Sequence, residues 1–276
     1  MIQKIILIFL LPILFVSCSD DDSQSIIPIV APQLNCKITG TSVATLTFDD
    51  IKIEGYNSTF SGKLHFDYDE QGRVVRTRGG LKAYNDLSSL APKWAFHDDI
   101  NDTIMYDNGI ISVKYSNNSN LRPYDKEFTI INGTIQSRKV ISYTGNSTTP
   151  VIYTYEYTAT GVVEKKDNVV YRTFTIENGN LTKVERLSRN YLTGEIFAKE
   201  EILFGDYDTA ENWLKGKFYI NGAFLRAFSA NNYKTFPRYE YRVENGQYVA
   251  LSEYDAHMNF GYDGNNVAGI FTVTCN

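Results

Sequence analysis

The amino-acid sequence predicts an all-β protein in which hairpins follow one another in a mainly antiparallel meander, with little helix. Three observations predict this class. Short runs alternate between apolar and polar residues, these runs are rich in Thr, Val, Ile, Tyr and Phe, and turns that contain glycine separate them. Amphipathic helical periodicity is scarce. The pattern leaves open whether the hairpins form one large twisted sheet or two packed sheets.

Alternation identifies the predicted strands most clearly in three places, residues 64–68, 151–157 and 239–243. In the second run, Tyr153, Tyr155 and Tyr157 share one face, because side chains two residues apart on a strand point the same way. Such a row favours a core or cross-strand ladder that stiffens the sheet. The alternative is an exposed platform of rings that binds a glycan or a protein partner.

Eight turns that contain glycine separate the predicted strands. Their glycines are Gly72, Gly109, Gly133, Gly161, Gly179, Gly222, Gly246 and Gly264. Most of them follow Asn or Asp, and Asn-Gly and Asp-Gly pairs supply the positive φ angles that a tight hairpin turn requires. Their spacing is irregular, so we expect hairpins of unequal length rather than a solenoid.

Two stretches interrupt the strand pattern. We expect residues 81–100 to form a connection that could hold a helical turn. We expect residues 205–216 to form a short helix that begins at Asp208 or Thr209 and ends at Gly216.

Each interruption contains one of the two tryptophans of the chain, Trp94 and Trp213. Binding residues are found more often on connections than on the strands that they join. We therefore predict that Trp94 and Trp213 contribute to a binding surface.

The charge of the chain argues against nucleic acid as a partner. The chain has 27 Lys and Arg against 32 Asp and Glu, a net charge of −5. There is no basic excess to neutralise phosphates. The hydrophobic content of 43% and the aromatic content of 14% exclude a disordered chain.

The sequence predicts no cofactor and no metal site. The three histidines lack the spacing of zinc ligands, and P-loop, dinucleotide-binding and Gly-x-Ser-x-Gly motifs are absent. Residues 67–72 begin like a calcium loop, but Gln71 and Arg78 occupy two of the positions that need oxygen ligands. No catalytic residue is predicted. The sequence neither identifies nor excludes a glycosidase pair of carboxylates that strand pairing brings together.

The first 17 residues have the pattern of a signal peptide. Lys4 provides a positive start, and residues 5–16 are apolar apart from Pro12. This apolar run is shorter than the roughly 20 residues that a membrane-spanning helix needs. Cys18 follows directly.

The sequence Phe15-Val16-Ser17-Cys18 resembles the lipobox of bacterial lipoproteins, with Phe15 in place of the usual Leu. The resemblance implies that Cys18 carries acyl chains, which include palmitate, and that residues 1–17 are removed. Two or more acyl chains hold a protein stably at a bilayer. Residues 18–33 would then be an acidic, proline-containing tether, and residues 34–276 the β-hairpin domain.

The acidic run over residues 19–22 is similar to the surface-export tag of Bacteroidota lipoproteins. That similarity implies display at the surface of the outer membrane. The alternative is a solvated tether, which three carboxylates near anionic headgroups would extend away from the membrane.

A second resemblance concerns the domain itself. Phe66-Asp67-Tyr68-Asp69-Glu70-Gln71-Gly72-Arg73-Val74 is similar to the Tyr-Asp hairpin unit of YD-repeat proteins, and residues 262–265 echo it. Together with the signal, this resembles a group of Bacteroidota lipoproteins whose domain has no assigned function. It implies a β-rich sheet and no catalytic residues.

Two further cysteines would lie in an oxidising compartment outside the cytoplasm. Cys36 and Cys275 each lie on an apolar strand face, one near each end of the domain. A disulfide between them would close a very long loop and stabilise the fold by up to about 5 kcal/mol. The alternative is a pair of buried free thiols.

These features predict a lipid-anchored protein of the cell outer membrane, exposed at the surface. The leading functional prediction is a non-catalytic module that binds a glycan or an envelope protein, or serves structurally. The competing predictions are a surface glycan or peptide hydrolase, and a periplasmic-facing accessory of outer-membrane assembly.

Overall fold

The computed structural model describes residues 36–42, 62–84, 93–116, 124–142, 149–254 and 271–275. Residues 36–276 belong to one compact unit. The described residues form a single antiparallel sheet of fifteen strands. This confirms the predicted all-β meander and shows that the hairpins make one sheet rather than two.

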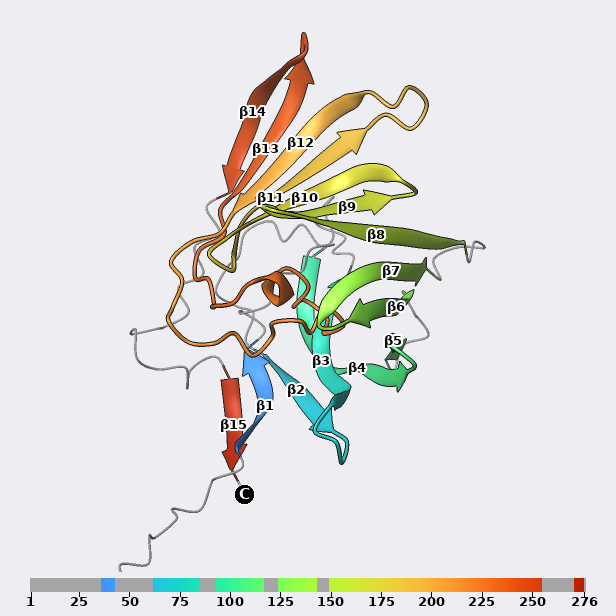
Figure 1. Cartoon of the computed structure of the whole chain (residues 1–276), viewed down its shortest axis with the longest axis vertical. Coiled ribbons are helices and arrows are strands. Elements are labelled where there is room, and N and C mark those ends of the chain that lie inside the picture. Colours follow the sequence, from blue (N-terminus) through green and yellow to red (C-terminus); the bar gives the residue numbers. More distant parts are fainter. Residues whose placement is uncertain are drawn as a thin grey trace, which may run out of the picture. The chain divides into compact units, whose positions relative to one another are not determined.

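The strands are β1 (Cys36–Ser42), β2 (Lys63–Tyr68), β3 (Val74–Tyr84), β4 (Lys93–Asp107), β5 (Ile110–Ser116), β6 (Tyr124–Ile131), β7 (Thr134–Ser142), β8 (Pro150–Thr158), β9 (Gly161–Lys166), β10 (Val169–Glu177), β11 (Asn180–Arg189), β12 (Ile196–Leu203), β13 (Arg238–Glu244), β14 (Gln247–Tyr254) and β15 (Phe271–Cys275). Neighbours in the chain are neighbours in the sheet from β1 to β14, and β15 pairs with β1 (Figure 1).

Four predicted Asn-Gly turns close hairpins, at Asn108-Gly109, Asn132-Gly133, Asn178-Gly179 and Asn245-Gly246. Their asparagines have φ of 45–51° and their glycines φ of 74–84°. Two successive positive φ angles define the tight turn whose twist matches that of the strands. Gly264 lies outside the described residues.

The turn between β9 and β10 has no glycine and was not among the predicted turns. Asp167 and Asn168 have φ of 50° and 65° there. Short side chains of this kind tolerate the left-handed region better than other non-glycine residues do. Conversely, Gly222 has the expected positive φ of 76° but lies in a connection and not in a hairpin.

The expected connection over residues 81–100 is wrong for its described part. β3 continues to Tyr84 and β4 starts at Lys93, so the described residues at both ends of this stretch are strand. A register shift between Arg78 and Gly80 lets the two strands continue past a bulge. Gly79 has a φ of +94°, and a Cβ there would lie 2.5 Å from the ring of Phe96, so the bulge needs glycine.

Residues 204–237 join β12 to β13 and are called here the covering segment. Its regular structure is one 3₁₀ turn, η2 (Arg226–Phe228), and isolated bridges. The helix expected over residues 205–216 is therefore absent. The carboxylate of Asp208 accepts hydrogen bonds from the backbone and the side chain of Asn232 at 3.0 and 3.1 Å, and so does not cap a helix.

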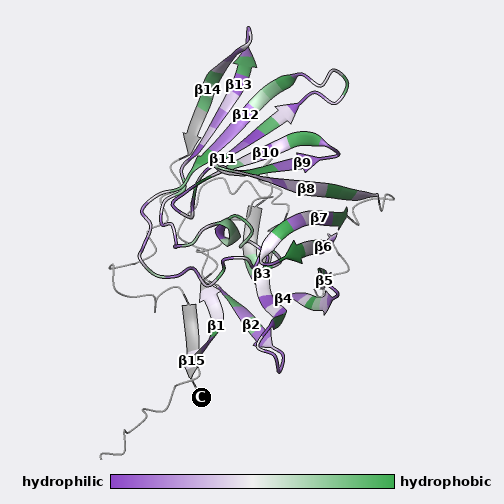
Figure 2. Cartoon of the chain, viewed as in Figure 1, coloured by the Kyte–Doolittle hydropathy of each residue, from purple (hydrophilic) through white to green (hydrophobic). Residues whose placement is uncertain are grey.

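The covering segment packs on one face of the sheet, called here the inner face (Figure 1). Rings from the segment meet rings from β2, β8 and β10. The centroid distances are 4.9 Å for Phe66–Trp213, 6.1 Å for Tyr155–Phe224 and 4.5 Å for Phe174–Phe228. Figure 2 shows that hydrophobic and hydrophilic residues mix along the strands. Because successive side chains of a strand point to opposite faces, such mixing lets the hydrophobic residues gather on one face.

The first and last described strands pair, and Cys36 lies opposite Cys275 in their register. Opposed residues of an antiparallel pair have Cα atoms about 4.5–5.5 Å apart. This range lies within the roughly 4.4–6.8 Å that a disulfide spans. The register therefore supports the predicted bridge, which itself stays a prediction.

Candidate functional site

A cluster of buried charges lies under the covering segment. Glu164 on β9, which has 0% of its surface exposed, lies between Arg138 on β7 and Arg172 on β10. Arg138 Nη2 and Arg172 Nη2 each donate to Glu164 Oε1 at 3.1 Å, and Arg172 Nε donates to Oε2. Tyr155 donates its hydroxyl proton to Oε1 at 2.6 Å.

The two guanidinium groups keep this carboxylate ionised. Burial by itself would raise the pKa of Glu164, but Arg172 and then Arg138 outweigh it and hold the pKa below its ordinary value. Burial raises the pKa of Tyr155 well above its ordinary value, so the phenol stays a donor. The cluster therefore remains charged and fully hydrogen-bonded at its carboxylate near neutral pH.

The covering segment closes the cluster from solvent. The ring of Phe224 lies 4.5 Å from the Arg138 guanidinium carbon and 5.2 Å from that of Arg172, measured to the ring centroid. Cation–π contacts of this kind are strongest where water is excluded. The Glu164 carboxylate is thus enclosed by the sheet and the covering segment, and a substrate cannot reach it.

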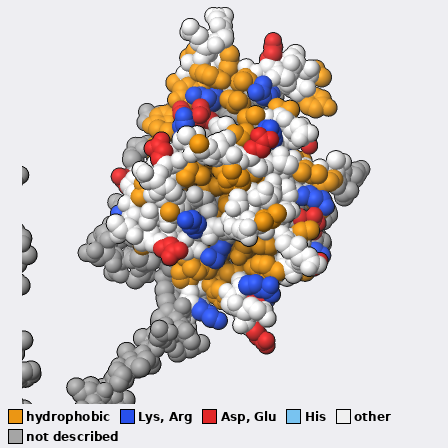
Figure 3. Space-filling view, viewed as in Figure 1, with side chains coloured by type: hydrophobic (Ala, Val, Ile, Leu, Met, Phe, Trp, Pro, Cys, Tyr) orange, Lys and Arg blue, Asp and Glu red, His pale blue; other side chains and the backbone are white. Residues whose placement is uncertain are grey.

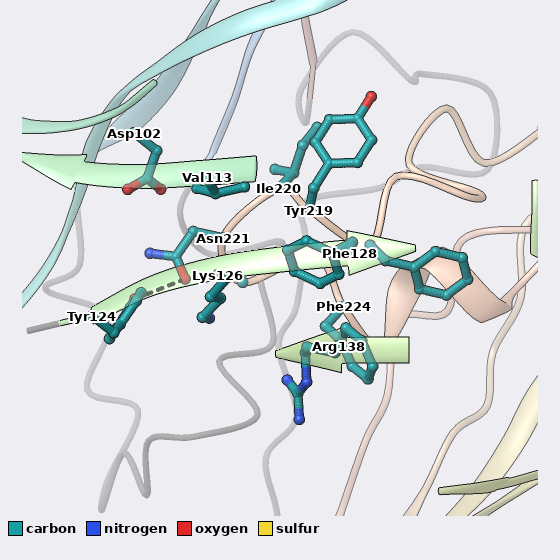
Figure 4. A pocket seen from close by; sticks show the side chains of 12 residues that line it. Asp102, Val113, Tyr124, Lys126, Phe128, Arg138, Tyr219, Ile220, Asn221 and Phe224 are labelled. Atoms are coloured by element: carbon teal, nitrogen blue, oxygen red, sulfur yellow. Dashed lines mark hydrogen bonds between the residues drawn. The ribbon is translucent and has the colours of Figure 1, made fainter. Parts of the chain in front are cut away.

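A small cavity lies beside the cluster, between β4–β7 and residues 218–224 of the covering segment (Figure 4). Its free space is about 10 Å³, which is room for about one water molecule. Figure 4 shows Asp102, Lys126 and Arg138 around it, and Tyr124 hydrogen-bonded to Asn221. A second cavity of about 10 Å³ lies beside Arg172 and Glu200.

Asp102 is the unusual group of this cavity. Its side chain is buried, Oδ2 accepts from Thr77 Oγ1 at 3.5 Å, and Oδ1 has no hydrogen-bond partner among the described residues. Burial raises the pKa of Asp102 to about 6, and the charge of Asp125 adds to this, while Lys126 and Thr77 oppose it. Such a shift is frequent at functional sites but also follows from burial alone.

This shift makes a pH-dependent contribution to stability. Because the pKa of Asp102 is higher in the folded protein, folding favours the protonated form, and its stabilisation is lost as the pH rises through about 6. We expect Asp102→Asn to gain about 2 kcal/mol of unfolding free energy relative to the unsubstituted protein between about pH 4 and about pH 7. Urea unfolding at several pH values measures this difference.

Asp98→Asn is the matched control, because it makes the same change at an exposed position of β4. It should change the unfolding free energy by less than about 0.5 kcal/mol. A difference between Asp102→Asn and the unsubstituted protein that is constant across this pH range would show that Asp102 does not titrate as described.

The three tyrosines predicted as a row share the inner face. Tyr155 belongs to the buried cluster, and the Tyr157 hydroxyl donates to the carbonyl of Ile135 at 3.1 Å. The Tyr153 ring lies 5.6 Å from that of Tyr171 and 4.5 Å from the guanidinium carbon of Arg138. These contacts agree with a cross-strand ladder more than with an open platform.

The predicted tryptophans lie apart from this row. The Trp213 ring packs on Phe66, and the Lys217 ammonium lies 4.3 Å from its centroid and donates to the Trp213 carbonyl. Trp213 is thus half-buried between two side chains and does not present an open ring. Trp94 lies opposite Ala83 in the register of β3 and β4, and its side chain is outside the description. Cys18 and the tether lie outside the described residues.

A different group of rings lies on the face opposite the covering segment. Glu200 on β12 is buried on the inner face, where it pairs with Arg186. Its neighbour Lys199 therefore points to the other face, as does Tyr241, which is opposite Lys199 in the register. The Lys199 ammonium lies 4.5 Å from the centroid of Tyr241 and 4.9 Å from that of Tyr248.

We call Phe197, Lys199, Glu201, Tyr241 and Tyr248 the outer aromatic patch. The Tyr241 and Tyr248 rings are 6.4 Å apart and the Tyr241 hydroxyl donates to Glu201 at 3.2 Å. Phe197 and Tyr248 are 56% and 47% exposed. The patch therefore presents two exposed rings at the surface, and the Lys199 and Glu201 side chains, each 16% exposed, lie beside the Tyr241 ring.

Sequence reasoning identified the strand that carries Tyr241 but not this patch. Alternation over residues 239–243 shows that Tyr239 and Tyr241 share a face, and only the packing of residues 204–237 on the inner face shows which face is open. The hairpin turn at Asn245-Gly246 was a usable signal, since it places Val243 opposite Tyr248.

No helix in the described parts of the chain is long and apolar enough to cross a bilayer.

Comparison with known proteins gives a structural resemblance alone. No family model matches the sequence, and no curated protein matches it. A porin-like protein from Bacteroides vulgatus ATCC 8482 is 9% identical, with a TM-score of 0.41, over 80% of this chain and 94% of that one. A porin-like protein from Bacteroides uniformis ATCC 8492 is 12% identical, with a TM-score of 0.33, over 78% and 89%. At TM-scores below 0.5, neither resemblance supports a function for this chain.

Proposed function

We propose that this chain is a lipid-anchored protein of the outer-membrane surface whose β-sheet binds a glycan through the outer aromatic patch. The anchor rests on the lipobox-like Phe15-Val16-Ser17-Cys18 and the tether that follows it. The binding role rests on one observation: Lys199 lies against the rings of Tyr241 and Tyr248 on the outer face of β12–β14, and Tyr248 and Phe197, two residues before Lys199, are exposed.

The chemistry of the patch suits a sugar. A tyrosine ring offers an apolar face to the C–H side of a pyranose and a hydroxyl to water or to the ligand. Lys199 and Glu201 lie beside the rings and supply a donor and an acceptor for sugar hydroxyls. Ion pairs of Lys199 with Glu185 and Glu201, each at 3.7 Å, hold the ammonium at the patch.

A hydrolase is the competing function, and the carboxylates under the covering segment disfavour it. A glycosidase needs two carboxyl groups that a substrate can reach. Glu164 is fully enclosed and Asp102 faces a cavity that has room for about one water molecule. Neither of these two carboxylates is therefore open to a substrate.

Binding of an oligosaccharide panel to the mature chain in detergent tests the proposal. Isothermal calorimetry with N-acetylglucosamine, mannose, xylose and glucose oligomers should find at least one saturable ligand. Tyr241→Ala and Tyr248→Ala should each weaken that ligand about tenfold, since a ring contact of about 1 kcal/mol or slightly more is lost.

Tyr191→Ala is the matched control, because Tyr191 is an exposed tyrosine on the β11–β12 loop outside the patch. Its affinity should equal that of the unsubstituted chain. Unchanged affinity in the Tyr241 and Tyr248 variants would reject the patch. Shortened oligosaccharide products would instead establish the hydrolase.

A further inference from the structure

β14 forms one edge of the sheet, and within the described residues it pairs with β13 alone. The side chains of residues 247–251 are exposed, although strand neighbours point to opposite faces. They include Tyr248, Val249 and Leu251, which are 47%, 37% and 52% exposed. In Figure 3, hydrophobic side chains appear at the surface in the region of β12–β14.

Such an edge usually carries features that prevent another strand from pairing with it. Lysine, proline, inward charges and bulges are the common ones. The sequence of β14, QYVALSEY, has no Lys, Arg or Pro, and its single charge is Glu253. One irregularity is present, a register shift between Glu240 and Tyr241 that falls opposite Leu251, and the edge is regular over residues 247–250.

The backbone of an edge strand offers a row of donors and acceptors that only another extended strand can match. Tyr, Val and Leu in this strand favour a pleated partner. The edge therefore calls for an added strand of low charge with aromatic or β-branched side chains. β14 itself meets that description, and each copy of the chain carries one.

We propose that β14 pairs antiparallel with β14 of a second copy, so that two sheets join at their edges about a two-fold axis. Antiparallel self-pairing places the start of one strand beside the end of the other. The two copies of position 253 would then lie at opposite ends of the joint, so that two like charges would not be paired across it. A two-fold contact of one surface with itself is the commonest form of assembly.

The joint has a consequence that rests on the proposed glycan binding. The two-fold axis of an antiparallel strand pair stands perpendicular to the sheet, so both outer faces look to the same side. Tyr248 lies on β14 itself and Tyr241 on the adjacent strand, so the two outer aromatic patches would become neighbours. A polymeric glycan would then engage two patches at once, with a gain in apparent affinity.

Light scattering of the mature chain in detergent, corrected for bound detergent, measures the assembly directly. We expect the mass of two chains at micromolar concentration, and the mass of one chain for Val249→Lys, with a dissociation constant raised at least tenfold. Met105→Lys is the matched control. Met105 is 41% exposed on β4, which is an interior strand of the sheet and not an edge strand, so its variant should remain a dimer.

Leu251→Lys serves as a second edge variant should Val249→Lys fail to fold, as judged by near-ultraviolet circular dichroism. A single-chain mass for the unsubstituted protein, a two-chain mass for the folded edge variants, or a single-chain mass for Met105→Lys would each overturn the proposal. These readouts do not depend on any glycan. A dimer without glycan binding would therefore reject the proposed function and leave the edge contact standing.

Discussion

Glu164→Gln is expected to lower the free energy of unfolding by about 3–5 kcal/mol. The substitution removes the negative charge that lies between Arg138 and Arg172, both of which are buried. Two buried guanidinium groups would then lose the carboxylate charge that they share. An amide also cannot accept all of the hydrogen bonds that the two carboxylate oxygens receive.

Urea unfolding followed by tyrosine and tryptophan fluorescence measures this loss. Glu156→Gln is the control, because it makes the same chemical change on the neighbouring strand in an ion pair with Lys165 at the surface. A surface pair contributes about 0–1 kcal/mol, so the control should stay within that range. Equal effects of the two substitutions would show that the buried cluster does not stabilise the fold as described.

The lowered pKa of Glu164 also predicts how its contribution to stability changes with pH. Its ionised form is favoured in the folded state, so its contribution to stability is present above the ordinary glutamate pKa and is lost as the pH falls. Asp102 acts in the opposite direction, because its raised pKa costs stability as the pH rises through about 6. The two carboxylates therefore set opposite ends of the pH range in which the sheet is most stable.

Cys18→Ala is expected to abolish incorporation of labelled palmitate and to remove stable membrane attachment. Each buried methylene of an acyl chain contributes about 0.8 kcal/mol, so the loss of two or more chains leaves no comparable anchor. The apolar residues 5–16 are shorter than a membrane-spanning helix. Metabolic labelling and fractionation of cells measure both effects.

Ser19→Ala is the control for this second prediction, because it changes the next residue and leaves the thiol in place. It should label and fractionate like the unsubstituted protein. Label in the Cys18→Ala protein would place the acyl chains elsewhere. An unmodified amino terminus in the native protein would contradict the lipid anchor altogether.

Turn chemistry was the most predictable part of the fold. Asn178-Gly179 adopts its positive φ angles because Asn tolerates the left-handed region and Gly adopts it readily, and this preference acts within two residues. The run over residues 64–68 was predictable for a similar reason, since Leu64 and Phe66 alternate with His65 and Asp67 regardless of what packs on them. Because these preferences act between residues that are close in the sequence, they can be predicted without knowing how the rest of the chain packs.

The covering segment was not predictable in the same way. Asp208, one of the two expected helix-starting residues, instead accepts a hydrogen bond from the backbone of Asn232, 24 residues away. The Asn212 side chain likewise donates to backbone carbonyls 14 and 17 residues away. A buried backbone group must find a partner, and a nearby amide or carboxylate serves as well as a helix does. Local propensity was therefore overridden by contacts that exist only after the segment has closed on the sheet.

The sequence alone determined the alternation of the strands, the sites of most hairpin turns and the resemblance to a lipoprotein signal, because each is a property of a few adjacent residues. The tertiary structure decided the rest. In the sequence, Glu164 does not differ from Glu156, yet the pairing of strands places Glu164 beside an arginine 26 residues away and leaves Glu156 in solvent. Which face of a strand is covered depends on where residues 204–237 pack, and burial, charge pairing and the exposed outer patch all follow from that choice.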